Sequence, residues 1–266
     1  MRLVRTFDKV NNVISVAAPV VTAFPFTFAA WARSTDPAAG NQTVMSLVDN
    51  TADDKHFDLR FAGASVGDPS QLVAQNAGTE RTTASSVPVA NKWHFIYGRF
   101  VGTSDRRFSL DFAPESSSGT SVGFFTPTHF CVGYRNDLTP DSPFGGQIAH
   151  VQVWNRDLSI FELQEAARKP GSIQRGLALY WPLWGASPES DYSGFSHPGT
   201  VSGATTDNIL PPIYTGRNFV TLHGLRYGAE GRRNFVQSDN NLYVGNLNGS
   251  LFSPRTRKLL AILGVG

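Results

Sequence analysis

Short apolar runs of strand length, separated by residues that turn the chain, are the feature that most constrains how this sequence can fold. They lie at residues 12–15, 26–33, 43–49, 56–61, 72–75, 93–101, 107–112, 130–134 and 147–154. Gly, Pro, Asp and Ser gather between them, for example at 114–119 and 138–143, and these residues turn or break the chain. Many short strands joined by turns are typical of a β-sandwich or jelly roll. The sequence therefore predicts an all-β fold.

Composition agrees with that prediction. The chain has 266 residues, which allows one or two domains and a sizeable core. Nineteen Phe and five Trp stand against two Met, and only 17% of the residues are charged, which argues against a helical bundle, a coiled coil or a disordered chain. The single cysteine, Cys131, excludes an intramolecular disulfide, so the fold must depend on its core.

One helix is predicted at residues 160–168. Ser159 and Glu162 have the spacing of a capping box, in which each side chain bonds the other's backbone N–H. Leu163 falls on the apolar face, and Pro170 with the glycine after it ends the helix. A helix this short needs packing against the sheets.

Charge divides the chain into two parts. Residues 213–266 carry seven Lys or Arg and two acidic residues, whereas residues 1–212 carry sixteen basic and nineteen acidic residues. We predict a sandwich domain at 1–212 and a basic C-terminal extension at 213–266 that acts as an anchoring or subunit-contact arm. The basic residues are too widely spaced to predict nucleic-acid binding.

The apolar stretch 13–32 is neither a typical signal peptide nor a typical membrane span. Pro19 and Pro25 interrupt it, and its end alternates between apolar and other residues as a half-buried strand does. We therefore expect the chain to be made in the cytoplasm and not to insert into a membrane.

Five segments together resemble a known superfamily. They are the motifs at 7–13, 26–33, 92–98, 132–133 and 144–159, of which the last, running into the capped helix, is the strongest. Their order and spacing resemble the laminin-G-like/pentraxin branch of the concanavalin A-like lectin and glucanase superfamily. This resemblance implies a concanavalin A-like jelly-roll β-sandwich of two antiparallel sheets with one short helix, followed here by an extended C-terminal segment.

A second resemblance points to a biological context. Residues 176–184, 191–194 and 197–203 resemble an ending that is common in laminin-G-like proteins of tailed bacteriophages and prophages. It implies a non-enzymatic structural protein of a bacteriophage virion, such as a capsid decoration, head-fibre or tail-associated protein. The implied location is the virion, and the implied partners are other virion proteins, in the capsid or tail, and copies of the chain itself.

No catalytic residue is predicted. The glucanase branch places acidic residues at alternate strand positions as a carboxylate pair, and none of the six Glu residues lies in that pattern. No arrangement of Ser, His and Asp places them in the roles of a nucleophilic triad, and the six His residues have no metal-ligand spacing. We therefore expect no enzyme activity.

Calcium is the one cofactor that the first resemblance implies. In pentraxin-like members, acidic and amide side chains of two loops converge on the metal, and Asp49 with Asn50 and Asn136 with Asp137 resemble these two sets. Arg135 departs from the pattern because it brings a positive charge into the second loop. The alternative is that these Asp and Asn residues form solvated turns.

Binding of a host-surface glycan, with or without calcium, is the alternative function, that of an adhesin. Aromatic rings stack on sugar faces, and Trp181, Trp184 and Tyr192 are the candidates, with Phe195 beside them. Aromatic residues in such strands also serve the core, and the sequence leaves both roles open.

Overall fold

The computed structural model describes the backbone of residues 3–63, 70–76, 79–83, 87–214, 219–222, 225–230, 233–238 and 241–245. Side chains are described for residues 3–63, 70–76 and 87–213. Contacts along the backbone divide the chain into two units, Met1–Ile213 and Tyr214–Gly266.

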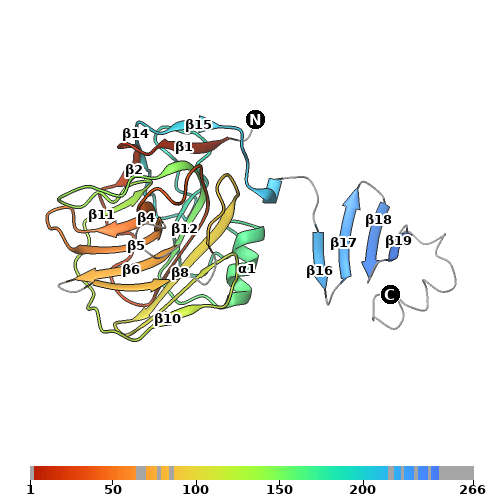
Figure 1. Ribbon diagram of the computed structural model, residues 1–266, viewed down its shortest axis with the longest axis horizontal. Coiled ribbons are helices and arrows are strands. Elements are labelled where there is room, and N and C mark those ends of the chain that lie inside the picture. The colour runs from red at the N-terminus through yellow and green to blue at the C-terminus, as the bar shows by residue number, and fades with distance from the viewer. Residues whose placement is uncertain are drawn as a thin grey trace. The chain divides into compact units, whose positions relative to one another are not determined.

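Two antiparallel sheets lie face to face in the first unit (Figure 1). The first sheet has eight strands in the order β10 (Ser116–Ser118), β9 (Asp105–Leu110), β8 (His94–Gly102), β3 (Phe26–Ser34), β12 (Gly145–Trp154), β1 (Val4–Asp8) and β15 (Thr205–Asp207), with β13 (Leu177–Trp181) also paired to β12. The second sheet has seven strands in the order β14 (Thr200–Ser202), β2 (Val13–Val16), β11 (His129–Val132), β4 (Gln42–Val48), β5 (Lys55–Phe61), β6 (Gln71–Asn76) and β7 (Thr79–Thr83). The predicted jelly-roll sandwich of two antiparallel sheets is confirmed.

Phenylalanine rings from both sheets fill the space between them. Phe26 on β3 stacks on Phe100 of β8 with ring centroids 4.3 Å apart, and Phe57 of the opposite sheet lies 5.4 Å from Phe26. All three rings are fully buried. Because successive strand residues point to opposite faces, every second residue of these strands enters the core, and the residues between them face outward.

The outer face of the eight-stranded sheet carries the helix α1 (Ile160–Arg168), seen beside β8 and β12 in Figure 1. The predicted capping box is present, since the Ser159 hydroxyl accepts from the Glu162 N–H and the Glu162 carboxylate accepts from the Ser159 N–H. Leu163 of α1 packs with Tyr97 and Trp154 of the sheet in a second apolar cluster. Tyr180, which lies under the candidate site described below, belongs to the same cluster.

The strand predictions need correction at one strand end and at several strands that were not predicted. The strand predicted at 107–112 ends at Leu110, because Asp111 and Phe112 have φ values of 53° and 60° and turn the chain. In addition, β1 and β13 were not among the predicted strands, although both pair with β12 in the first sheet. The short strands β7, β10, β14 and β15 and the strands of the second unit were not predicted either.

The second unit contains a four-stranded antiparallel sheet in its described residues. Its strands follow one another as β16 (Phe219–Leu222), β17 (Leu225–Glu230), β18 (Arg233–Ser238) and β19 (Asn241–Gly245), after a short 3-10 helix η2 (Pro212–Tyr214). The part of the extension with the run of apolar residues near the C-terminus lies outside the described residues. Across the described residues, we find no helix with the length and apolar character needed to cross a membrane.

Candidate functional site

A group of aromatic side chains, here called the aromatic patch, lies beside the end of β13. It consists of Trp184 and Tyr192 at the surface, with Tyr180 and His150 beneath them. Trp184 is 42% exposed and Tyr192 is 53% exposed, and their ring centroids lie 5.6 Å apart at an angle of 60°. His150 and Tyr180 are buried, and the Nδ1 atom of His150 lies 2.9 Å from the Tyr180 hydroxyl. Two exposed rings therefore rest on a buried, hydrogen-bonded aromatic pair.

A buried carboxylate holds the segment that carries Tyr192. Asp191, whose side chain is 1% exposed, accepts hydrogen bonds from the N–H groups of Tyr180 at 3.0 Å, Ser193 at 2.9 Å and His197 at 3.0 Å. The Tyr192 N–H in turn donates to the Tyr180 carbonyl at 2.9 Å. Asp191 therefore fixes the segment after it to β13 and determines where the Tyr192 ring lies.

A bulge in β12 provides the other support of the patch. The pairing of β12 with β3 shifts register between Ala149 and Gln152, and His150 at the shift has a φ of 53°. The His150 ring lies 6.0 Å from Tyr180 and 6.5 Å from Trp184. Sequence alternation alone does not reveal such a bulge, because an extra residue changes which face each later residue occupies.

Trp181, one of the three predicted sugar-contacting residues, belongs to the core. Its side chain is fully buried, its ring lies 5.6 Å from Phe130, and its indole N–H donates to the His197 carbonyl at 2.7 Å. It therefore presents no ring face to a ligand, which is a correction for this residue. Phe195 is 61% exposed and stacks against His197.

Other side chains of the protein already bind the first predicted calcium pair, Asp49 and Asn50. The Asp49 carboxylate accepts from the Thr51 hydroxyl at 2.6 Å and forms an ion pair with Lys55 at 3.4 Å. The hydrogen bond from Thr51 lowers the pKa of Asp49. Asn50 accepts a hydrogen bond from the Thr128 hydroxyl at 2.8 Å.

The second predicted pair lies in the loop of residues 133–143, here called the Arg135 loop. The Asp137 carboxylate forms an ion pair with Arg135, with Oδ2 and Nε 2.9 Å apart, while the backbone of Asn136 hydrogen-bonds the Cys131 thiol. Burial raises the pKa of Asp137 to about 6, against the opposing effect of Arg135.

These partners do not fit a calcium site. Lys55 holds the carboxylate of the first pair and Arg135 that of the second. Calcium needs six or more oxygen ligands directed at one point, and a guanidinium beside the carboxylate opposes a second cation there. Among the residues with described side chains, no three His, Cys, Asp or Glu form a group that could hold a metal ion.

Under the Arg135 loop, β5 carries ionisable side chains at alternate positions on its outer face: His56, Asp58 and Arg60. All three are buried, at 1%, 0% and 3% exposure. Burial raises the pKa of Asp58 to about 7 and lowers the pKa of His56 to about 3. The alternation of three ionisable residues is visible in the sequence, but their burial and the contact of Arg135 and Asp137 with His56 depend on the tertiary fold, so the sequence analysis did not predict this cluster.

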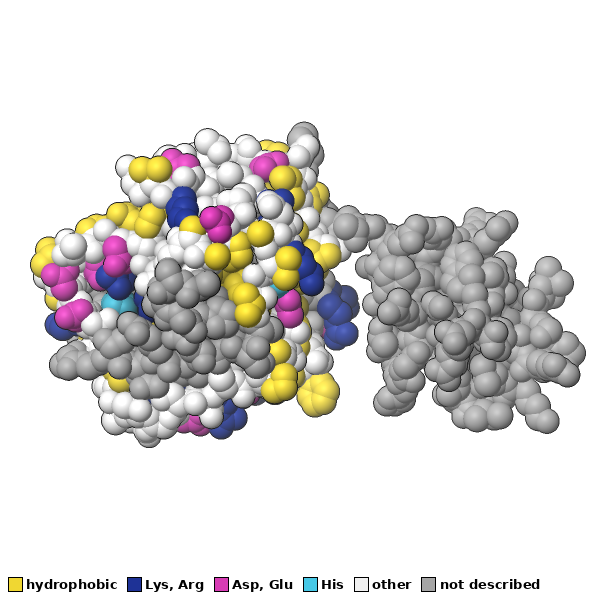
Figure 2. All heavy atoms as spheres, in the orientation of Figure 1, with side chains coloured by type: hydrophobic (Ala, Val, Ile, Leu, Met, Phe, Trp, Pro, Cys, Tyr) yellow, Lys and Arg dark blue, Asp and Glu magenta, His cyan; other side chains and the backbone are white. Residues whose placement is uncertain are grey.

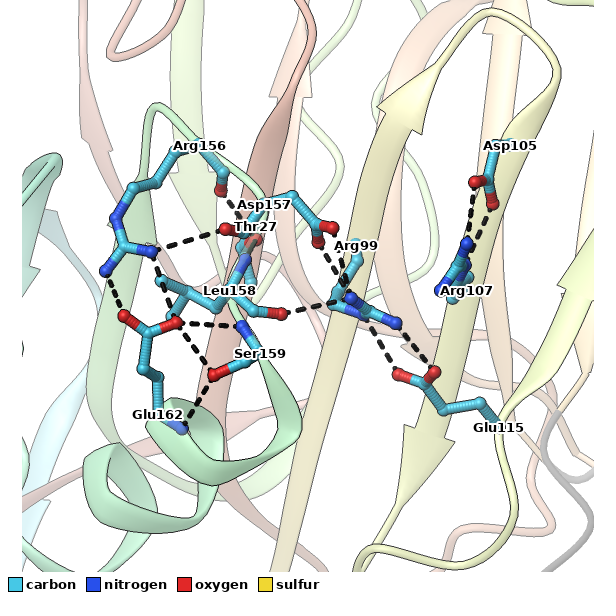
Figure 3. Close-up of polar contacts among 10 residues, drawn as sticks. All are labelled: Thr27, Arg99, Asp105, Arg107, Glu115, Arg156, Asp157, Leu158, Ser159 and Glu162. Carbon is cyan, nitrogen blue, oxygen red and sulfur yellow. Dashed lines mark hydrogen bonds and ion pairs between the residues drawn. The ribbon is translucent and has the colours of Figure 1, made fainter.

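A network of ion pairs lies on the outer face of the eight-stranded sheet, near the start of α1 (Figure 3). The Arg99 guanidinium binds Glu115 with two hydrogen bonds of 3.0 and 2.8 Å and also binds Asp157 at 3.0 Å. A further hydrogen bond from Arg99 reaches the Leu158 carbonyl at 3.0 Å. One buried guanidinium thus joins β8, the segment before β10 and the chain that enters the helix.

Arg156 completes this network on the helix side. It pairs with Glu162 at 2.7 Å, and this hydrogen bond, with those from Ser159, lowers the pKa of Glu162 to about 2 (Figure 3). The carboxylates of Glu115, Asp157 and Glu162 all lie on guanidinium groups. This arrangement stabilises the entry to α1, and the lowered pKa keeps Glu162 ionised, which does not suit a general acid.

The visible surface of the first unit mixes residue types. Acidic and basic side chains are scattered over it, and hydrophobic side chains reach the surface in small groups, several of them near α1 (Figure 2). Phe161 on α1 is 82% exposed. Phe161 is a useful comparison for the aromatic patch, because it is a single exposed ring on which no other described ring stacks.

Comparison with protein families gives one match. Residues 8–164 match the family described as the concanavalin A-like lectin/glucanases superfamily. No curated protein sequence matches the chain.

Solved structures share the fold. A putative carbohydrate binding protein from Bacteroides ovatus has a TM-score of 0.61 and 22% identity, over 78% of this chain and 60% of that one. A heptameric SAP-like pentraxin from Limulus polyphemus has a TM-score of 0.59 and 10% identity, over 80% and 97% of the two chains. Domain 4 of an extracellular arabinanase from Geobacillus stearothermophilus, solved with arabinotriose, has a TM-score of 0.50 and 13% identity, over 60% and 74%. The chain thus spans 60% of the length of the Bacteroides ovatus protein.

Proposed function

Because the chain belongs to the concanavalin A-like lectin/glucanase superfamily, we propose that it is a non-catalytic carbohydrate-binding protein that holds a sugar ring against Trp184 and Tyr192. The observation that carries this proposal is the aromatic patch, in which two partly exposed rings lie 5.6 Å apart. Trp and Tyr combine a large apolar face with a polar tip, which suits a ligand with apolar C–H faces and hydroxyl edges.

The support beneath the rings favours a binding role. Asp191 fixes the segment of Tyr192 through several hydrogen bonds, and His150 with Tyr180 forms the floor. A ring surface that is already ordered loses little conformational entropy when a ligand binds. The binding surface is therefore preorganised in the free protein.

The acidic residues near α1 support a non-catalytic role. Retaining and inverting glycosidases need one carboxyl group that donates a proton and a second that acts as nucleophile or base. Glu115 and Asp157 share the Arg99 guanidinium instead. Two similar structures, a putative carbohydrate binding protein and an arabinanase domain solved with arabinotriose, favour the same role.

Binding to a broad array of immobilised glycans, followed by titration calorimetry with the best ligand, tests the proposal. Trp184→Ala and Tyr192→Ala should each weaken binding by about ten- to a hundredfold, the loss of one stacking contact. Phe161→Ala is the matched control, since it removes an exposed ring elsewhere and should leave affinity unchanged.

Two results contradict the proposal. One is a wild-type protein that binds no glycan on an array that includes bacterial surface polysaccharides. The other is a folded Trp184→Ala/Tyr192→Ala double variant with wild-type affinity.

As a second candidate, we propose that the protein is a structural component of a bacteriophage virion, in which residues 213–266 are the anchoring arm. The separate unit Tyr214–Gly266, with its own four-stranded sheet and its basic composition, favours this role, as does the phage-like ending at 176–203. A capsid or tail position and a sugar-binding role are compatible in one particle.

Quantitative mass spectrometry of gradient-purified particles tests the second candidate. A fixed copy number relative to the major capsid protein supports it, and the value separates a capsid coat from a rare tail part. Absence of the chain from purified particles contradicts it and leaves the sugar-binding proposal unaffected.

A further inference from the structure

The Arg135 loop closes on itself. Arg135 and Asp141 exchange two backbone hydrogen bonds of 3.1 Å, and the Tyr134 hydroxyl donates to the Pro140 carbonyl at 3.0 Å. These contacts lie at the neck of the loop and leave Leu138 near its tip 58% exposed. They fix the neck, and two further backbone hydrogen bonds tie the ends of the loop to β4: Gly133 N–H to the Val44 carbonyl at 3.1 Å and Thr43 N–H to the Ser142 carbonyl at 2.8 Å. The contacts that reach β5 are those of side chains.

Two carboxylates of this loop pair with the same guanidinium, that of Arg135. Arg135 Nε lies 2.9 Å from Asp137 Oδ2, and Arg135 Nη2 lies 2.8 Å from Asp141 Oδ2. The Asp137 side chain is 1% exposed and that of Arg135 is 16% exposed, whereas that of Asp141 is 50% exposed. The ion pair with Asp137 is therefore largely removed from water, where removing one partner is costly.

The same guanidinium reaches the strand under the loop. Arg135 Nη1 lies 3.4 Å from His56 Nε2, and the other ring nitrogen of His56 lies 3.8 Å from Asp137 Oδ2. Asp58, next on this face of β5, lies 3.5 Å from His56 Nε2 and is fully buried. Arg135 thus lies between the loop carboxylates and the polar residues of the sheet.

We infer that Arg135 is a built-in cation that holds residues 133–143 on β5, and that this loop keeps its conformation without a bound metal ion. Carboxylates and an imidazole are also the groups with which proteins hold divalent metals. Here the guanidinium already supplies the positive charge to both loop carboxylates, and a metal ion at Asp137 would have to displace it. The inference is independent of sugar binding.

Thermal unfolding of the full-length protein with calcium chloride and with a chelator tests the inference. The wild-type Tm should be the same in both solutions. Arg135→Gln should lower Tm by about 5–10 °C, since a buried carboxylate loses its counter-ion. Amide hydrogen exchange at residues 134–141 should accelerate at least tenfold in this variant. Arg168→Gln, which breaks an exposed pair with Glu165, is the matched control and should leave both values unchanged.

A second variant keeps the test decisive if Arg135→Gln does not fold. Combining Arg135→Gln with Asp137→Asn also removes the buried negative charge that the single variant leaves unpaired. This double variant should fold with a Tm above that of the single variant. Three results overturn the inference: a wild-type Tm that rises with calcium or falls with the chelator, an Arg135→Gln protein that matches Arg168→Gln, or a double variant that is no more stable than the single one.

Discussion

The aromatic patch and the Arg135 loop lie on different sheets of the same sandwich and use their polar groups in opposite ways. In the patch, a buried carboxylate, Asp191, orders the chain so that two rings stay at the surface. In the loop, the carboxylate of Asp137 is itself covered, and Arg135 pairs with it. One region therefore leaves an ordered apolar surface available, and the other satisfies its charges internally.

This difference shows why the position of a residue in the fold matters more than its type. Asp137 resembles a metal ligand in the sequence, but in the fold it is the partner of Arg135. Trp184 resembles a core residue of a β-protein, but 42% of its surface is exposed. The comparison predicts that substitutions under the patch change ligand binding, whereas substitutions under the loop change stability and its pH dependence.

The largest effect is expected from Asp191→Ala. The variant loses the acceptor of three backbone N–H groups, and we expect the free energy of unfolding to fall by about 3 kcal/mol and sugar binding to be lost with it. Urea denaturation and calorimetry measure the two effects. Asp105→Ala, which removes a carboxylate that is 40% exposed and paired with Arg107, is the control and should change neither. Wild-type affinity in a folded Asp191→Ala protein would show that Asp191 does not position the patch.

The next largest effect is expected from Asp58→Asn, and it depends on pH. The pKa of Asp58 is about 7 in the fold against 3.8 for the free group, so the folded state binds this proton more tightly than the unfolded state does. The contribution of Asp58 to stability is therefore full below pH 4 and is lost as pH rises through 7.

Asparagine has no such proton to lose. Asp58→Asn should therefore be more stable than the wild type by about 2 kcal/mol at pH 8, and this gain should shrink towards zero at pH 4. Comparing the two proteins at each pH largely cancels the opposing titration of His56, whose lowered pKa stabilises the fold above pH 6.5 and loses that effect as pH falls to about 3. A stability difference that does not change with pH would contradict the burial of an ionisable Asp58.

The smallest effect is expected from Glu162→Gln, in the helix that shares its layer with Tyr180. It weakens the capping box and the contact with Arg156, and we expect a loss of about 1 kcal/mol at neutral pH, since this carboxylate is partly exposed. The pKa of Glu162 is lowered to about 2 from 4.5, so its contribution is present above pH 4.5 and disappears as pH falls to 2. The two proteins should therefore converge in acid, which circular dichroism at several pH values can measure, and a constant gap would contradict this role.

The elements that depend on local sequence signals were predictable. The helix 160–168 was found because Ser159 and Glu162 cap it and Pro170 follows it, which are signals within a few residues. The alternation of residues 26–33 placed β3 correctly, because burial between two sheets imposes a period of two on the strand.

The site depended on contacts between distant residues. The Tyr180 N–H donates to the Asp191 carboxylate, and the His150 ring lies near Trp184 because of a bulge in β12, so no local sequence pattern predicts the patch. Trp181 and Trp184 are three residues apart, and only the tertiary fold decides that the first is buried and the second exposed. The resemblance to pentraxin-like proteins drew attention to Asp137 but did not predict its ion pair with Arg135.

The most direct test of the central claim is a glycan-array measurement in a chelator, with the wild type and the Trp184→Ala/Tyr192→Ala double variant side by side. Sugar binding at the aromatic patch predicts glycan signals for the wild type that persist in the chelator and disappear in the folded double variant. Signals that vanish on chelation, or that remain in the double variant, would contradict the claim and place the ligand elsewhere on the protein.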